Sequence, residues 1–376
     1  MLRPVAVVFA VALLATSCRF SHVKADETVH ISGRALSASG TPLAQVQVRL
    51  FKEADLGEAL TGIVLAIGSL GTVCLLPTAP PVCRQAHVAT TDSAGNYTFT
   101  LEGADVQGTL GTESTLDLVV AGDGPDAPST VLSFPARSAS MKLPDARLWR
   151  AAPQVAEGAG DVRLRWLPVR GWAGTDAHYS VQLYDPRREA SVWSEPATRS
   201  SGTIDGRVLE DVSGKVAAAA HTNLGGATGT TDVHAGYLSA RLPVHPLVGA
   251  PPSRNDSCFA VSGTGTDLGR TRQARCGVTD GDLLSPASLR AARGANVTGV
   301  VIDLGRIRPV ALVVARGVAG SYIVELSKDG KNYRPISTTG ASPAAIQPAG
   351  RPAARYVRVR SPSGLGESLM TEISVW

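Results

Sequence analysis

The residue types that usually carry enzymatic chemistry form no recognised pattern in this chain. The sequence contains no G-x-S-x-G nucleophile motif, no H-E-x-x-H zinc motif and no Walker-type phosphate loop. Seven histidines are scattered along it. His221, His234 and His245 lie nearest one another, at spacings of 13 and 11 residues that match no common ligand motif. We therefore expect no catalytic activity. A hydrolase on an unfamiliar β scaffold remains an alternative to the two binding hypotheses given below.

The cysteines predict an oxidising compartment. Besides Cys18 near the N-terminus, the other four form two local pairs, Cys74 with Cys83 and Cys258 with Cys276. Their spacings fit disulfides, whereas CxxC spacing and nearby histidine ligands for zinc are absent. We expect both disulfides to form and Cys18 to remain unpaired.

The first 25 residues predict an export signal. A basic start is followed by the apolar run 5–15, which is too short to cross a bilayer as a helix. Val23-Lys24-Ala25 fits an ordinary cleavage site. The segment that ends at Cys18 instead resembles a bacterial lipobox, in which Cys18 would be lipidated and become the first mature residue. Both alternatives predict an extracytoplasmic protein, either secreted or anchored to the membrane by lipid.

The composition predicts a folded protein of several β domains. The chain has 376 residues, of which 44% are hydrophobic and 18% charged, and its 39 Gly and 24 Pro supply many turns. The formal charge is only +4 and no charged block occurs, so the sequence gives no indication of nucleic-acid binding.

The pattern of residues 26–150 predicts a small β-sandwich. Segment 30–52 combines a strand, a Gly/Ser turn and a second, alternating strand, which we interpret as antiparallel partners. In 90–101, a Ser-Ala-Gly-Asn turn precedes Tyr97, Phe99 and Leu101 on one strand face. Together these segments resemble the carboxypeptidase regulatory-like family, which implies a binding or spacer module without catalytic residues.

An insertion at 53–84 interrupts that resemblance. It contains the mostly apolar stretch 60–76 and is closed by the Cys74–Cys83 pair. A short buried helix docked on the sandwich is one interpretation, and contact with a membrane or a partner protein is the other.

Residues 151–248 carry another β pattern. Val162, Leu164 and Trp166 alternate as in a half-buried strand. With the segments 178–185 and 191–198, this region resembles a fibronectin type III-like sandwich, and the stretch 248–253 reads as a linker.

Residues 249–376 carry the clearest resemblance. The segments CGVTDGDLLSPAS, VVIDLGRIRPV, YIVELSKDGKNYRPI, ARYVRVRS and EISVW follow one another in this order. They resemble a discoidin-type (coagulation factor C-terminal, galactose-binding-like) domain, which implies a jelly-roll sandwich. Independently of any family, Asp329-Gly330 between two strand patterns predicts a hairpin turn. The fold expected for the whole chain is thus all-β, with three tandem sandwiches and a short helical insertion in the first.

The discoidin resemblance implies a binding function and a structural calcium ion. Sugar-binding members hold calcium with backbone carbonyls, an Asp of the D-G turn and a Glu near the C-terminus. The matching positions here are Asp280 and Glu372, with Asp282 as a third candidate, and hard cations prefer such oxygen ligands. Turn hydrogen bonding by Asp280 and an exposed strand end at Glu372 are the structural alternatives.

Arginines near that turn are the candidate ligand-binding residues. The stretch after the D-G turn contains no aromatic platform for a sugar, but it contains Arg290 and Arg293, and Arg272 precedes it. Guanidinium groups bind anionic glycans or headgroups through bidentate hydrogen bonds. We expect a non-catalytic protein that binds a cell-surface or extracellular glycan. The alternative is an envelope assembly protein that binds a protein partner through 53–84.

Overall fold

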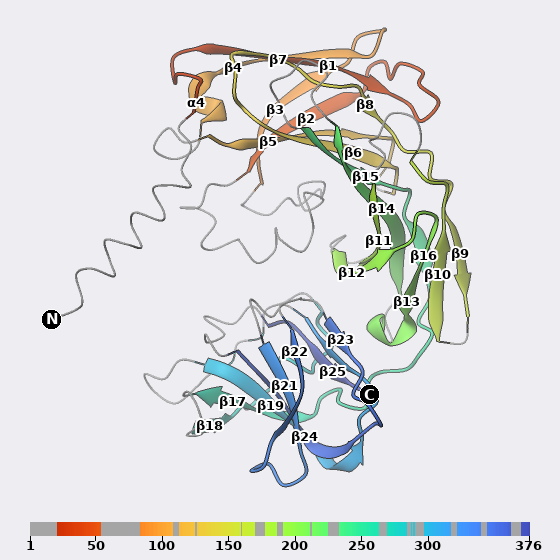
Figure 1. Ribbon diagram of the computed structural model, residues 1–376, viewed down its shortest axis with the longest axis vertical. Helices are drawn as coiled ribbons and strands as arrows, with labels where there is room; N and C mark the ends of the chain where they lie inside the picture. The colour runs from red at the N-terminus through yellow and green to blue at the C-terminus, as the bar shows by residue number, and fades with distance from the viewer. Residues whose placement is uncertain are drawn as a thin grey trace, which may run out of the picture.

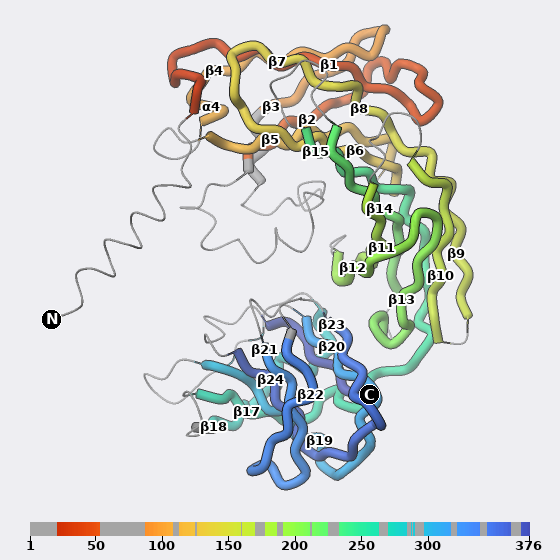
Figure 2. The backbone as a smooth tube through the Cα atoms, viewed as in Figure 1, coloured from red at the N-terminus to blue at the C-terminus, as the bar shows by residue number. Residues whose placement is uncertain are grey.

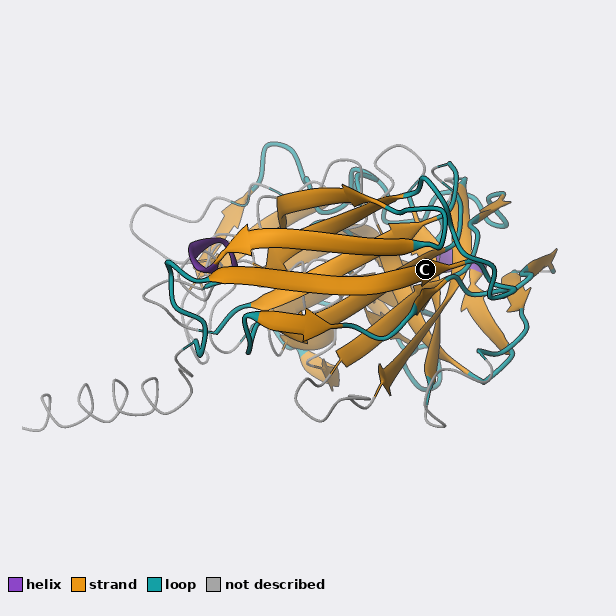
Figure 3. Ribbon diagram, turned by 90° about the horizontal axis from the view of Figure 1, so that it is seen from above, coloured by secondary structure: helices purple, strands orange, loops and turns teal. Residues whose placement is uncertain are grey.

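A computed structural model of the chain shows an all-β protein. It describes residues 21–53, 83–107, 113–124, 126–158, 160–169, 177–185, 191–210, 213–224, 233–262, 269–283, 287, 289, 297–316, 322–339, 344–361 and 370–376. Strands dominate these residues, and the helices among them are the short α4 (Gly103–Val106) and the 3-10 turn η3 (Gly206–Val208) (Figure 3). No described helix is long and apolar enough to cross a membrane. The all-β prediction is confirmed.

The first unit is a sandwich of two sheets. One sheet joins β1 to β4, β7 and β8, and the other contains β2, β3, β5 and β6 (Figure 1). The strands are β1 (Thr28–Leu36), β2 (Gln47–Glu53), β3 (Cys83–Thr90), β4 (Asn96–Glu102), β5 (Thr115–Ala121), β6 (Ser129–Pro135), β7 (Ser140–Lys142) and β8 (Ala146–Arg147). On β4, Tyr97, Phe99 and Leu101 are all buried, as their alternation predicts.

The expected pairing of the first two strands is wrong. β1 pairs with β4, β7 and β8, whereas β2 pairs with β3 and β5 in the opposite sheet. Both strands exist, but the chain crosses between the layers at their turn. Alternation specifies which residues of a strand are buried and does not specify its neighbour.

The second unit continues the sheet of the first. Its strands are β9 (Gln154–Glu157), β10 (Asp161–Arg165), β11 (His178–Tyr184), β12 (Ser191–Ala197), β13 (Ser201–Asp205), β14 (Gly214–Leu224), β15 (Val233–Leu238) and β16 (Leu242–Val244). β15 pairs antiparallel with β6 of the first unit, from His234 opposite Ser133 to Leu238 opposite Ser129. Among the described strands this pairing gives one sheet in the order β12-β11-β14-β15-β6-β5-β2-β3, with β16 beside β14; we name it the long sheet.

A single hydrophobic core follows the long sheet through both units. It contains Phe99 and Phe134 of the first unit as well as Leu164 and Trp166 of the second. Trp149 also donates from its indole nitrogen to the carbonyl of Leu167, at 3.0 Å. Residues 26–248 therefore form one packed body, in which the two resembled modules share a sheet and a core.

The segment before β1 belongs to this body. Val23 is 1% exposed within the core, and its carbonyl oxygen accepts a hydrogen bond from Gln107 Nε2. The carbonyl of Ala25 accepts the amide of Ala104 at 3.0 Å. Cleavage after Ala25 would remove a core side chain, whereas a mature chain that begins at Cys18 would keep it. Cys18 itself lies outside the described residues, so its lipidation remains a prediction.

A substitution at Val23 tests this packing. We expect Val23→Ser to lower the free energy of unfolding by about 2 kcal/mol, because a buried valine loses its apolar contacts. Urea denaturation of the purified chain measures the effect. Lys24→Ser is the matched control, since the Lys24 side chain is exposed. Equal midpoints for the two variants would show that this segment does not stabilise the fold.

The C-terminal unit is a sandwich of two further sheets. A six-stranded sheet, in the order β18-β17-β19-β24-β21-β22, packs against the short sheet β23-β20-β25. The strands are β17 (Ser257–Ser262), β18 (Gly269–Arg272), β19 (Val297–Pro309), β20 (Val313–Ala315), β21 (Tyr322–Ser327), β22 (Arg334–Thr339), β23 (Ala344–Ile346), β24 (Ala353–Arg360) and β25 (Ile373–Val375). The described core residues between its sheets all come from this unit. Figure 2 shows the backbone of this unit, in teal and blue, below the strands of the first two units.

The predicted D-G hairpin joins β21 and β22. Gly330 adopts φ 71°, and Asp329 Oδ1 accepts hydrogen bonds from the amides of Lys331 and Asn332, both at 2.8 Å. These bonds, together with those from the Asn332 and Ser327 side chains, hold the pKa of Asp329 far below its usual value. The turn is therefore fixed by local hydrogen bonds.

The insertion of the first unit and its predicted disulfide fall outside the described residues. The insertion is not described between 54 and 82, so neither its helix nor its contact with a partner is tested. Cys74 lies in the same gap, and the Cys74–Cys83 disulfide stays a prediction.

Candidate functional site

The outer face of the six-stranded sheet carries a cluster of arginines. On β24, Val357 and Val359 point into the C-terminal core, so Arg358 and Arg360 project from the opposite face. On the edge strand β18, Arg272 lies opposite Phe259, which follows the core residue Cys258. We name this surface the arginine face; it comprises Arg270, Arg272, Arg355, Arg358, Arg360, Tyr333 and Tyr356.

Two carboxylates neutralise part of the charge. Glu325 accepts hydrogen bonds from Nε of Arg358 at 2.5 Å and from Nε of Arg360 at 3.0 Å. Asp303 accepts from Nε and Nη2 of Arg355, at 2.8 and 3.0 Å. Five arginines minus two carboxylates leave a formal charge of +3 on the face.

The same bonds shift the carboxylate pKa values. Burial by itself raises the pKa of Glu325, but the hydrogen bonds and charges of Arg358 and Arg360 outweigh it and hold the pKa below its ordinary value. Asp303 behaves in the same way, because its bonds from Arg355 and the Gly305 amide outweigh its burial. Both carboxylates are therefore ionised at neutral pH and fix their arginines in place.

Tyr333 connects the edge strand to the centre of the face. The guanidinium carbon of Arg358 lies 3.9 Å from the centre of its ring, and that of Arg270 lies 5.4 Å away. Arg270 also donates to the carbonyl of Gly330. A side chain at Gly330 would meet the ring of Tyr356 at 3.0 Å, so the hairpin turn rests directly on the face. In such cation–π contacts, the aromatic ring attracts the guanidinium groups electrostatically and so helps to hold both arginines in place.

Arg270 and Arg272 are the most accessible cations of the face. Both are exposed, and within the described part of the chain neither forms an ion pair with a carboxylate. They lie on β18, a strand that the sequence did not predict, two residues apart and on the same side. Of the predicted ligand-binding residues, Arg272 thus joins this face, while Arg290 and Arg293 lie outside the described residues.

The other members of the face were missed from sequence. The segment ARYVRVR does show arginine at alternate positions of a strand, and this signal could have identified Arg358 and Arg360. Their proximity to Tyr333 and Arg270 depends on strand order and could not be read from the sequence.

The D-G turn and Glu372, which carry the predicted calcium ligands, lie close together, but Asp280 is exposed whereas Glu372 is buried. The amide of Gly281 donates to Glu372 Oε2 at 3.2 Å, which places the D-G turn beside Glu372. Asp280 is exposed, and its Oδ1 accepts the Asp282 amide at 3.0 Å, as in the turn alternative. Glu372 is fully buried, which contradicts an exposed strand end. Burial and then the nearby charge of Glu210 raise the pKa of Glu372 to about 9.

An arginine already lies against this turn. A side chain added at Gly281 would meet Nη1 of Arg254 at 2.3 Å, so the guanidinium packs on the Cα of that glycine. Among the described residues, no group of three or more His, Cys, Asp or Glu side chains could hold a metal ion. The guanidinium of Arg254 is a poor neighbour for a divalent cation, because like charges repel, and calcium binding remains a prediction.

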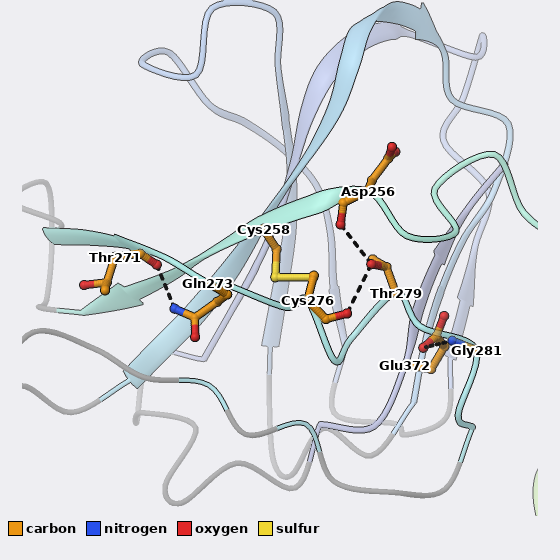
Figure 4. The surroundings of a disulfide bond; sticks show 8 residues. All are labelled: Asp256, Cys258, Thr271, Gln273, Cys276, Thr279, Gly281 and Glu372. Carbon is orange, nitrogen blue, oxygen red and sulfur yellow. Dashed lines mark hydrogen bonds between the residues drawn. A yellow bond between two sulfur atoms is a disulfide. The ribbon is translucent and has the colours of Figure 1, made fainter.

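The predicted Cys258–Cys276 disulfide is present. It links β17 to the segment after β18, with 5.5 Å between the Cα atoms (Figure 4). Next to it, Thr279 Oγ1 donates to the carbonyl of Asp256 at 3.0 Å, and Gln273 donates to the carbonyl of Thr271 at 2.7 Å. The bridge therefore secures the edge strand that presents Arg270 and Arg272.

The three histidines singled out earlier are separated in the fold. His221 lies on β14 opposite His178, His234 lies on β15 opposite Asn223, and His245 follows β16. His245 contacts Glu157 at 3.2 Å and is mostly exposed. They do not converge on one site.

Comparisons with known proteins identify no family for this chain. No protein-family model and no curated protein matches it. Similar solved structures include SpGH29, at 16% identity and TM-score 0.24, over 34% of this chain and 27% of that one. They also include the Clostridium perfringens module CpGH89CBM32-5 in complex with GalNAc-β-1,3-galactose, at 16% identity and TM-score 0.26. That match covers 34% of this chain and 97% of the module. A third is the C-terminal domain of a Bacteroides fragilis chitobiase, at 19% identity and TM-score 0.24. That match covers 32% of this chain and 89% of the chitobiase domain.

Proposed function

We propose that this protein is a non-catalytic, extracytoplasmic binding protein that recognises an anionic polysaccharide through the arginine face. The observation that carries the proposal is the pair of exposed arginines, Arg270 and Arg272, on one side of β18. Carboxylate or sulfate groups that repeat along a polysaccharide match planar, charged donors at neighbouring positions.

The rest of the face supports those two arginines. Arg358 and Arg360 are held by Glu325, and the ring of Tyr333 contacts the guanidinium groups of both Arg270 and Arg358. Because these side chains are fixed before a ligand arrives, little conformational entropy is lost on binding. The Cys258–Cys276 disulfide supports an extracytoplasmic location, since disulfides persist in oxidising compartments.

The test compares dextran sulfate with neutral dextran as probes. We expect Arg270→Ser with Arg272→Ser to weaken dextran sulfate binding by about tenfold or more, because two charge-assisted contacts are lost. Binding by the unaltered chain should also weaken as NaCl rises from about 50 to about 300 mM, as screening requires. Titration calorimetry measures both effects.

The matched control is the double variant Arg163→Ser with Arg165→Ser. These arginines are exposed at alternate positions of β10, so the net charge changes equally at a distant strand. Equal loss in both double variants would mean that net charge alone attracts the probe. Equal binding of neutral dextran would overturn the anionic site in favour of a neutral sugar site.

A further inference from the structure

A buried ion cluster joins the second unit to the C-terminal unit. Glu210 is fully buried, and its Oε1 accepts a hydrogen bond from Arg316 Nη1 at 2.9 Å. Its Oε2 pairs with Nη2 of Arg254, and Ser374 Oγ also donates to Oε1. Glu210 belongs to the second unit, whereas the other three residues belong to the C-terminal unit.

The backbone around Glu210 is shaped for this contact. η3 is followed by Leu209 and then by Glu210, which adopts φ 56°, a left-handed conformation that costs energy for a residue with a side chain. Nη2 of Arg316 donates to the carbonyl of Val208 at 2.6 Å. The C-terminal unit thus binds both the side chain of Glu210 and the backbone two residues before it.

Apolar contacts accompany the ion cluster. Leu283, Leu312 and Val314 of the C-terminal unit belong to the core of the long sheet rather than to their own unit's core. Leu247, in the connection between the units, and Trp376, the last residue, pack against the same core. The side chains of Arg316 and Glu210 are 2% and 0% exposed, so their ion pair is shielded from water. Such shielding strengthens an ion pair and makes an unpaired member costly.

Arg254 connects this cluster to the D-G turn. Its guanidinium lies against Gly281, whose amide donates to Glu372, and it pairs with Glu210 from the other unit. A positive charge therefore already stands next to the predicted calcium ligands.

We propose that Glu210, Arg254 and Arg316 form a fixed joint that holds the C-terminal sandwich in one orientation on the second unit, with Arg254 serving beside the D-G turn as an internal cation in place of calcium. The arginine face is then presented at a constant angle to the body formed by 26–248. This inference does not depend on the ligand of that face.

The main test uses the full chain with Glu210→Gln. This change keeps the shape of the side chain and leaves Arg316 buried without its counter-charge. Hydrogen exchange should accelerate on the order of 100-fold in peptides that cover 204–210 and 310–316, because the joint opens. Small-angle X-ray scattering should show a larger radius of gyration. The C-terminal β-sandwich should keep its slow exchange in β19 and β24.

Glu157→Gln is the matched control. Glu157 lies in the same unit but contacts the exposed imidazole of His245, so we expect no change in either measurement. Because Glu210→Gln could prevent folding altogether, Arg254→Met serves as a second variant: Arg254 is 18% exposed at the rim, and we expect a smaller acceleration at the same peptides. The joint would be overturned if peptides 204–210 and 310–316 exchanged hydrogen at the same rate in Glu210→Gln, Arg254→Met and the Glu157→Gln control.

Calcium alone is the probe for the second half of the inference. We expect the melting temperature of the unaltered chain to be the same with calcium chloride and with EDTA, and titration calorimetry to detect no calcium binding. A higher melting temperature with calcium, or saturable binding heat, would refute the role of Arg254 as the internal cation. Dextran sulfate binding by Glu210→Gln tests the proposed function separately from the joint. Because the arginine face lies within the C-terminal unit, we expect this variant to bind dextran sulfate as the unaltered chain does.

Discussion

A fragment that contains only residues 151–248 is expected to remain unfolded. In the whole chain, β15 lies between β14 and β6, and the pairs from His234–Ser133 to Leu238–Ser129 join the two units. Removal of the first unit leaves β15 as an edge strand whose β6 side is unpaired, and it exposes one side of the shared core. Far-UV circular dichroism and the dispersion of NMR amide signals measure the outcome.

The fragment 21–248 is the control for this experiment. It keeps the long sheet intact, and we expect it to unfold in one cooperative transition, because both units share a core. A well-dispersed spectrum and a cooperative transition for 151–248 alone would show that the fibronectin type III-like region is an independent domain that merely abuts its neighbour.

Loss of the Cys258–Cys276 disulfide is expected to have the second large effect. The bridge closes a loop with a sequence separation of 18, and its removal should destabilise the C-terminal unit by about 3 kcal/mol in the chain-entropy model. Cys258 is fully buried, so Cys258→Ala with Cys276→Ala avoids placing a hydroxyl group in the core. Chemical denaturation of the double variant, compared with the unaltered chain, gives the difference.

The same double variant should weaken ligand binding. The disulfide fixes the segment after β18, and β18 is an edge strand that pairs only with β17 among the described strands. A looser edge presents Arg270 and Arg272 less precisely, so affinity for dextran sulfate should fall even where the unit stays folded. Unchanged stability in the double variant would indicate that the loop is already fixed by the bonds of Thr279 and Gln273.

Several features could be predicted because they depend on neighbouring residues. Alternation on β4 and β10 identifies their buried faces, and the Asp329-Gly330 turn specifies its hairpin through local hydrogen bonds. The Cys258–Cys276 pair could be predicted from the short separation of its two cysteines along the chain. The all-β class follows from many such segments.

Features that depend on distant residues could not be predicted. The crossing of β1 and β2 between layers, and the pairing of β15 with β6, depend on which sheet edges meet. Glu210 attracts no attention in the sequence, because an isolated Glu after a short turn usually lies in solvent. Its role requires Arg316, 106 residues away, to be buried beside it.

By itself, the sequence determined the all-β class, the position of most strands and the C-terminal disulfide, since strand periodicity, turns and short-range cysteine pairing are local properties. Only the tertiary structure decided that the first two modules share one sheet, that arginines from β18 and β24 meet on one face, and that an arginine lies at the predicted calcium site. Each of these depends on strand order and on burial between units, and in a buried environment the partner of a charge, rather than its residue type, decides what that charge can do.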